Sequence, residues 1–332
     1  MYLLFSLSAS AAMLALVVAE PAPLTPSRDS YPMLSPDGAT LLFQSNRAGH
    51  EALYLADANG EHVRLFVDTG DDPSVAVWSP DGKRIAFVAS VQGQTEVFVM
   101  NADGTGRRRL TDHPGDDSHP HWSADGRRVF FNSARATPDP KADWAKQWHN
   151  VFSLDVGSGD LRQHTHCQTV CTYPVPSPDG RRIAYRKIID SAGFDWALRG
   201  IARNSEVFVA DLDGRNEMNL SDHAAYDGWP TWSPDGRWIA FSSNRIGRPN
   251  AGQLFVVRPE GGESHQITDG SASYSQHSWS ADGKFLYASR CWEALDWSWE
   301  YGHLVRVPID LAALEAGARA ALIGAAQPRR GR

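Results

Sequence analysis

The chain has 332 residues and a net charge of −7, and its basic residues cluster only at Arg107–Arg109 and at the C-terminal end. Proteins that bind nucleic acid need a clustered positive surface, so this composition argues against a nucleic-acid partner. The length would accommodate two ordinary domains or one closed array of repeats.

Residues 1–19 carry no charged side chain, are mostly apolar and end in small residues before Glu20. This pattern predicts a cleaved signal peptide, which would make the rest of the chain periplasmic or secreted. The alternative is an uncleaved membrane anchor, because the apolar run is just long enough to span a bilayer. The protein is expected to contact a membrane only in that second case.

A four-residue turn sequence recurs along the chain. Ser-Pro-Asp-Gly begins at four positions and Ser-Ala-Asp-Gly at two, and in chain order the six copies start at Ser35, Ser79, Ser123, Ser177, Ser233 and Ser280. Consecutive copies are 44 to 56 residues apart, a period that indicates a repeat architecture. Proline presets φ, Asp hydrogen-bonds locally and Gly accepts positive φ, so each copy is predicted to be a turn.

Each repeat reads as four short β-strands separated by turns, which is the pattern of one propeller blade. We therefore predict an all-β, six-bladed β-propeller of four-stranded antiparallel blades over residues 20–326, followed by a basic tail at 327–332. Leu24 and Thr25 precede the first turn at the spacing of an outer strand, so the N-terminal strand is predicted to close the ring. Residues 311–326 could form a short helix or a spare strand.

One repeat carries a family resemblance. The residues Ser-Pro-Asp-Gly-Arg-Trp-Ile-Ala-Phe-Ser-Ser-Asn-Arg at 233–245, with Gln-Leu-Phe-Val-Val at 253–257, resemble the WD40-like (PD40) repeat of the TolB family, and the resemblance covers roughly residues 24–310. It implies a six-bladed propeller, usually periplasmic and often a docking surface for envelope proteins. TolB itself has an α/β domain before its propeller. The chain resembles a free-standing propeller instead, so a role in the Tol complex is not implied.

The three cysteines are Cys167, Cys171 and Cys291. In an oxidising compartment Cys167 and Cys171 are expected to form a local disulfide. The alternative is a metal site that adds His164 and His166, although no second Cys/His cluster at zinc-finger spacing accompanies them.

Antiparallel strand order places the turn sequences on one face of the propeller and the connectors between second and third strands on the other, here called the top face. The connectors of blades three, four and six are long and rich in aromatic residues. Loops on a rigid scaffold commonly carry function, so ligand-binding residues are predicted at Trp148, His149, Trp196, Trp297 and Trp299. Alternatively, these rings pack the loops against each other.

The first strand of each blade supplies a second set of candidates. Four residues before the turn sequences stand Tyr31, Val75, His119, Tyr173, Trp229 and Gln276, and two residues before them stand Met33, Val77, His121, Val175, Thr231 and Ser278. Residues two apart share a strand face. The first set is therefore predicted to ring the top mouth of the central channel, and the second set to lie one layer deeper. The predicted ligand-binding residues among them are Tyr31, His119, His121, Tyr173, Trp229 and Gln276.

These features favour a binding module for a partner protein or an oligosaccharide, without a cofactor, over an enzyme. A second possibility is a structural scaffold of an envelope complex. No Gly-x-Ser-x-Gly hydrolase motif is present in the sequence.

The enzyme alternative rests on His119 and His121, which could hold a divalent metal ion. The chain is similar to the oligogalacturonate lyases, a propeller family that holds a metal in a His and Gln cluster and cleaves an acidic sugar. The nearest equivalents in kind are His119, His121, Gln276 and His277, but they do not align with that family's motif, and no catalytic residue is assigned. A net charge of −7 also disfavours a polyanionic substrate.

Overall fold

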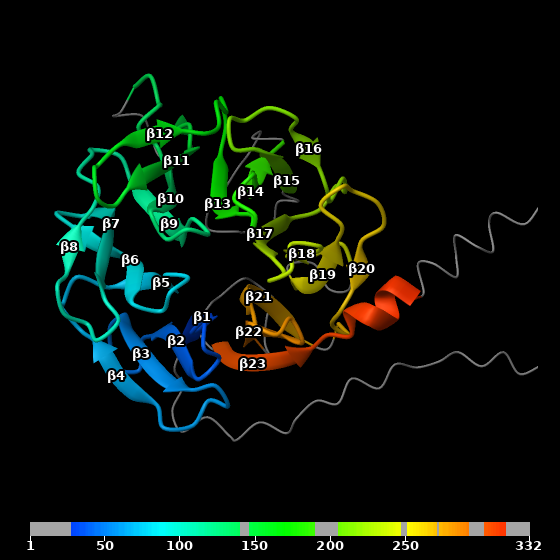
Figure 1. Cartoon of the computed structure of the whole chain (residues 1–332), viewed down its shortest axis with the longest axis horizontal. Coiled ribbons are helices and arrows are strands. Elements are labelled where there is room, and N and C mark those ends of the chain that lie inside the picture. Colours follow the sequence, from blue (N-terminus) through cyan, green and yellow to red (C-terminus); the bar gives the residue numbers. More distant parts are fainter. Residues whose placement is uncertain are drawn as a thin grey trace, which may run out of the picture.

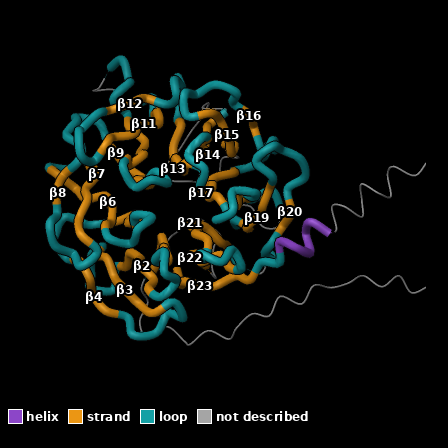
Figure 2. Tube along the Cα trace, viewed as in Figure 1, coloured by secondary structure: helices purple, strands orange, loops and turns teal. Residues whose placement is uncertain are grey.

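The computed structural model describes residues 28–139, 146–189, 205–246, 251–270, 272–291 and 302–316. These residues form six antiparallel sheets arranged around a central axis in sequence order (Figure 1). Strands and loops make up nearly all of the described chain, with one short helix at 311–316 (Figure 2). The predicted six-bladed β-propeller is confirmed.

The first five blades have four strands each, ordered from the axis outward. Blade one contains β1 (Asp29–Leu34), β2 (Thr40–Ser45), β3 (Ala52–Asp57) and β4 (Arg64–Val67). Blade two contains β5 (Ser74–Trp78), β6 (Arg84–Val91), β7 (Gln94–Asn101) and β8 (Arg108–Arg109). Blade three contains β9 (Asp117–Trp122), β10 (Arg128–Ser133), β11 (Asn150–Asp155) and β12 (Leu161–Gln163).

Blade four contains β13 (Cys171–Pro176), β14 (Arg182–Ile188), β15 (Ser205–Asp211) and β16 (Met218–Asn219). Blade five contains β17 (Asp227–Trp232), β18 (Ile239–Ser243), β19 (Gln253–Val257) and β20 (His265–Gln266). Blade six has three strands within the described residues, β21 (Ser273–Trp279), β22 (Phe285–Cys291) and β23 (Gly302–Pro308).

The recurring turn sequence joins the first and second strands of every blade. In blade four, Ser177 Oγ donates to Asp179 Oδ1 at 2.6 Å and accepts from the N–H of Arg182 at 2.9 Å, while Gly180 has a φ of 68°. The same two hydrogen bonds and a positive-φ glycine occur in the other five copies. The Ser, Asp and Gly of the repeat are therefore each required by the turn.

Tryptophans that directly precede the turns connect neighbouring blades. In three of them the indole N–H donates to a backbone carbonyl of the preceding blade: Trp122 to Val77 at 3.3 Å, Trp232 to Val175 at 2.9 Å and Trp279 to Thr231 at 3.1 Å. These three side chains and Trp78 are buried. All four tryptophans therefore belong to the core.

Blades one and six contact each other directly. Ser278 Oγ donates to the Pro32 carbonyl at 2.7 Å, and the Tyr287 hydroxyl donates to the Ala58 carbonyl at 3.0 Å. In Figure 1 the first strands lie beside β22 and β23. The closing strand predicted at Leu24 and Thr25 lies outside the described residues, as do the predicted signal peptide and basic tail.

The short helix begins directly after blade six. Its Glu315 forms ion pairs with Arg237 at 3.0 Å and Arg258 at 3.1 Å, and it packs beside the outer part of blade five. Of the two alternatives for the C-terminal region, the helix holds for residues 311–316. In the described part of the chain, no helix has the length and apolar character needed to cross a membrane.

Candidate functional site

Each inner strand is distorted at the residue four before its turn sequence. All six of these residues have a positive φ, between 47° and 55°. Pairing with the second strand changes register at the same point in every blade. This backbone conformation is uncommon for residues other than glycine, and such outliers cluster at functional sites. The inner strands of all six blades are therefore bent in the same way towards the axis.

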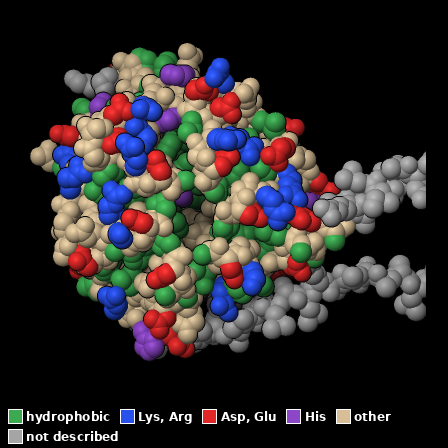
Figure 3. Space-filling view, in the orientation of Figure 1, with side chains coloured by type: hydrophobic (Ala, Val, Ile, Leu, Met, Phe, Trp, Pro, Cys, Tyr) green, Lys and Arg blue, Asp and Glu red, His purple; other side chains and the backbone are tan. Residues whose placement is uncertain are grey.

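A pocket with a volume of about 100 Å³ opens at the axis. Each blade contributes the residues four, three and two positions before its turn, so both predicted rings line it. The expected strict alternation is wrong for the residue between them, which also lines the pocket because the strand is bulged. None of the eighteen lining residues is Asp, Glu, Lys or Arg. In Figure 3 hydrophobic side chains border the central hollow and charged ones lie mainly farther out.

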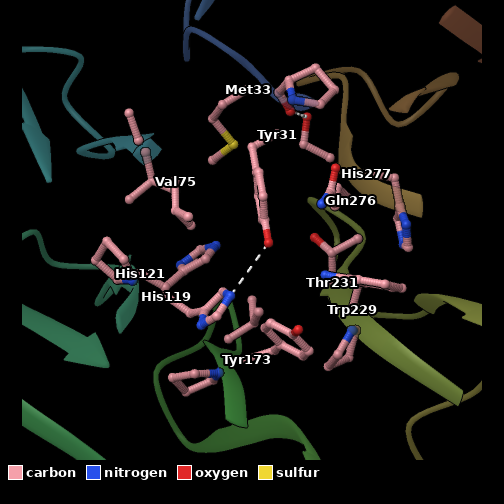
Figure 4. A pocket seen from close by; sticks show the side chains of 18 residues that line it. Tyr31, Met33, Val75, His119, His121, Tyr173, Trp229, Thr231, Gln276 and His277 are labelled. Carbon is pink, nitrogen blue, oxygen red and sulfur yellow. Dashed lines mark hydrogen bonds between the residues drawn. The ribbon is translucent and has the colours of Figure 1, made fainter. Parts of the chain in front are cut away.

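Four aromatic rings form a continuous row across the mouth (Figure 4). The Tyr31 hydroxyl lies 3.4 Å from His119 Nε2, and the His119 ring meets Tyr173 edge-on with centroids 4.2 Å apart. Tyr173 stacks on Trp229 with centroids 5.5 Å apart. The row runs from blade one to blades three, four and five, whereas blade two contributes Val75 to the mouth. Among the described residues, blades two and six contribute no aromatic ring to this row, and Val75 and Gln276 stand there instead.

The histidines of the pocket are neutral at neutral pH. Burial, reinforced by the Arg186 charge, lowers the pKa of His119 to about 3. Its Nδ1 lies 3.0 Å from Ser118 Oγ and 3.1 Å from Asn132 Oδ1. Burial also lowers the pKa of His121. Because none of the described lining side chains is charged, this part of the pocket suits a neutral ligand.

Arg186 lies behind the aromatic row, outside the pocket lining, and sequence reasoning missed its contribution. Its buried guanidinium lies 4.6 Å from the Tyr173 ring centroid and donates to the Tyr226 hydroxyl and to Thr172 Oγ1, both at 3.1 Å. It therefore supports the aromatic row from behind. A charged residue within the apolar run of β14 was the available signal.

Two other predicted ligand-binding residues, Trp148 and His149, lie elsewhere in the described part of the chain. Trp148 and His149 do not line the pocket; Thr137 Oγ1 accepts from the N–H of Trp148 at 2.9 Å. His149 is buried, and its burial lowers its pKa to about 4. Trp196, Trp297 and Trp299 lie outside the described residues.

Cys167 and Cys171 form a disulfide in this structure. The alternative of a metal site there does not fit the surroundings, because His164 bonds through Nδ1 to the Leu212 carbonyl at 2.5 Å and through Nε2 to Ser153 Oγ at 2.7 Å. Across the described ranges, no three His, Cys, Asp or Glu side chains are grouped so as to hold a metal ion.

Comparison with known proteins places the fold. A solved structure of a putative TolB from Agrobacterium tumefaciens is 21% identical, with a TM-score of 0.61, covering 86% of this chain and 92% of that one. An oligogalacturonate lyase in complex with manganese is 15% identical, with a TM-score of 0.55 and coverage of 87% and 92%. At these identities the likeness concerns the fold alone.

Two comparisons concern the sequence. The uncharacterized peptidase YuxL of Bacillus subtilis is 33% identical over 115 residues, which are 35% of this chain and 16% of that protein, so the match spans only a small part of that relative. The family model of the TolB beta propeller domain (PD40) matches residues 71–198 and 144–294, which together exceed half of the chain. The chain therefore belongs to the TolB β-propeller domain family.

Proposed function

We propose that this protein is a binding module whose channel mouth receives a neutral, largely apolar group of a partner protein. The observation that carries the proposal is the composition of the pocket: residues from six blades line it, and none bears a full charge at neutral pH. An apolar pocket with a few convergent polar groups is the usual form of a ligand site. The Tyr31 hydroxyl, His119 and Gln276 supply those polar groups.

A partner protein is favoured over an oligosaccharide. Sugars stack on open aromatic faces and need many hydrogen-bonding groups around them. Here the rings of Tyr173 and Trp229 are stacked on each other, and Trp229 is only 8% exposed. An apolar side chain presented by a protein segment needs less polar complementarity and fits a small pocket better.

We also propose that the protein acts in the periplasm or outside the cell. Two features support this location: the uncharged, apolar segment at residues 1–19 and the Cys167–Cys171 disulfide, since structural disulfides persist mainly in oxidising compartments. The family match is compatible with a docking role there.

The enzyme alternative is weaker at the described mouth. A metal ion there would need His119 and His121, but the Nδ1 of His119 bonds to neighbouring side chains and its Nε2 faces Tyr31. His121 Nδ1 lies 3.3 Å from the Trp122 carbonyl. Tight divalent sites in proteins use three or four ligands with the correct geometry.

Selection of peptides from a display library on the immobilised mature protein tests the proposal. We expect recovered peptides to share one apolar or aromatic residue with no acidic neighbours, and to bind equally well with or without a chelator. Recovery of acidic peptides would count against the proposal, and so would failure to recover any binding peptide. So would one transition-metal ion per chain that disappears in His119→Ala, or turnover of oligogalacturonate with Mn²⁺, since both would favour the enzyme.

A further inference from the structure

Two interfaces between blades carry the same polar cluster with one substitution. At the start of the third strand stands a glutamate, Glu96 in blade two and Glu206 in blade four. Glu96 accepts hydrogen bonds from the Thr111 hydroxyl and from the backbone N–H of His113. Glu206 accepts the equivalent bonds from the Ser221 hydroxyl and from the backbone N–H of His223, which lie at the same spacings of 15 and 17 residues. In each cluster an aspartate 21 residues after the glutamate begins the next inner strand and pairs with an arginine. These pairs are Asp117 with Arg135 and Asp227 with Arg245.

Between blades two and three the charges balance. Glu96 pairs with Arg109 at 2.6 Å, and Asp117 pairs with Arg135 at 2.6 Å. Two carboxylates thus face two guanidinium groups. Both carboxylate side chains are at most 1% exposed, so this pairing offsets much of the cost of burying them.

Between blades four and five one arginine is missing. Asp227 pairs with Arg245 at 2.8 Å, but the position that corresponds to Arg109 holds Asn219. The Asn219 side chain instead accepts from the N–H groups of Ser221 and Asp222. Glu206 and Asp227 are 3% and 0% exposed. Two buried carboxyl groups that interact and share one counter-charge do not both ionise readily.

The other charged groups around the pair do not supply the missing charge. Lys187 of β14, opposite Glu206 in the sheet, pairs with Glu217 at 2.6 Å. Arg186, also of β14, bonds to Thr172 and Tyr226. Asp222 and His223 are exposed residues of the turn after β16, and His223 contributes its backbone N–H to Glu206.

We propose that Glu206 and Asp227 hold one proton between them and that this proton latches blade four to blade five. Its release as the pH rises leaves two buried carboxylates at the interface, with Arg245 paired to Asp227. Asp227 lies on β17 two residues before Trp229 of the channel mouth, so the latch sits next to the aromatic row. The proposal is independent of what the mouth binds.

The direction of the pH effect follows from the titration of the pair. Burial, with a further contribution from Asp227, raises the pKa of Glu206 from 4.5 to about 7, and burial raises the pKa of Asp227. A carboxyl group whose pKa is raised by folding binds its proton more tightly in the folded state. Its contribution to stability is complete below the unfolded pKa and is lost as the pH rises through about 7.

Glu206→Gln tests the latch, because glutamine resembles the protonated acid. The fold accommodates this side chain at the corresponding position of blade five, where Gln253 accepts from Thr268 Oγ1 at 2.7 Å. Urea unfolding would be measured on the full chain from pH 5.5 to pH 8. We expect the unfolding equilibrium constant of the wild type to rise, relative to Glu206→Gln, by on the order of 30-fold over this range.

Glu96→Gln is the matched control, since its carboxylate has its own arginine. Because burial raises the pKa of the neighbouring Asp117 to about 6, the effect of Glu96→Gln should change by no more than about fourfold between pH 5.5 and pH 8, well below the change expected for Glu206→Gln. Asn219→Arg, which restores the balanced cluster, should flatten the wild-type profile as Glu206→Gln does. Parallel profiles for the wild type and Glu206→Gln would overturn the proposal, and so would the same pH trend in Glu96→Gln.

Discussion

Trp232→Ala is expected to destabilise the propeller by about 3–5 kcal/mol, the usual cost of truncating a large buried aromatic residue. The Trp232 side chain lies in the core shared by blades four and five, and its indole N–H donates to the Val175 carbonyl at 2.9 Å. The Arg182 guanidinium lies 5.1 Å from the ring centroid. Truncation removes apolar packing and the hydrogen bond to the Val175 carbonyl. Chemical denaturation monitored by circular dichroism measures the change.

Trp232→Phe separates the two contributions. It keeps most of the ring and removes the hydrogen bond, so it should cost about 1–2 kcal/mol. Equal losses for the two variants would show that the hydrogen bond, and not packing, holds the blades together. A loss below about 1 kcal/mol for Trp232→Ala would contradict the assignment of this tryptophan to the core between the blades.

Stability is expected to fall steeply between pH 6.5 and pH 4. Burial lowers the pKa of His119 to about 3 and those of His149 and His277 to about 4, so all three are neutral in the folded protein while they are protonated in the unfolded chain. Each therefore contributes up to about 1.4 kcal/mol of lost stability per pH unit below 6.5. Glu206 and Asp117 act in the opposite direction, because burial raises their pKa to about 7 and about 6.

His119→Gln should reduce the loss of unfolding free energy below pH 6.5 by up to about 1.4 kcal/mol per pH unit. This change in slope is expected whatever the effect of the substitution on stability at neutral pH. Urea unfolding at several pH values between 4 and 7 gives the slope. His62→Gln is the control, since His62 is exposed and pairs with Asp57. An unchanged slope in His119→Gln would mean that the histidine is hydrated in the folded protein.

The repeat predicted most of the fold because its residues act locally. Ser, Asp and Gly form the same turn wherever they recur, as the bonds of Ser177 show, and the tryptophan before that turn is buried in all four repeats that have one. The period therefore established the number of blades and their order.

The sequence predicted which residues of the inner strands line the channel mouth, but not the backbone geometry there. Counting back from the turns identified all six residues of the first ring, including Val75. Alternation along a regular strand could not reveal the positive φ at these residues, because that conformation depends on packing around the axis. The contribution of Arg186 was missed for the same reason: its partner Tyr226 belongs to the next blade.

The proton shared by Glu206 and Asp227 is likewise a property of two blades together. The sequence contains both carboxyl residues and the change from Arg109 to Asn219. Only the structure shows that these positions correspond and that both carboxyl groups are buried. Aligning repeats on their glutamates, and not only on their turns, is the comparison that would have revealed it.

The affinity of a display-selected peptide for Val75→Trp tests the central claim most directly. An indole at this position would occupy part of the pocket that Val75 lines, and the fold already carries a tryptophan at the equivalent position, Trp229, with a similar backbone. We predict that binding, measured by calorimetry, weakens at least about tenfold in Val75→Trp, a loss of about 1.4 kcal/mol, and is retained in Val75→Ala. Unchanged affinity in a folded Val75→Trp protein would place the binding surface elsewhere and contradict the account.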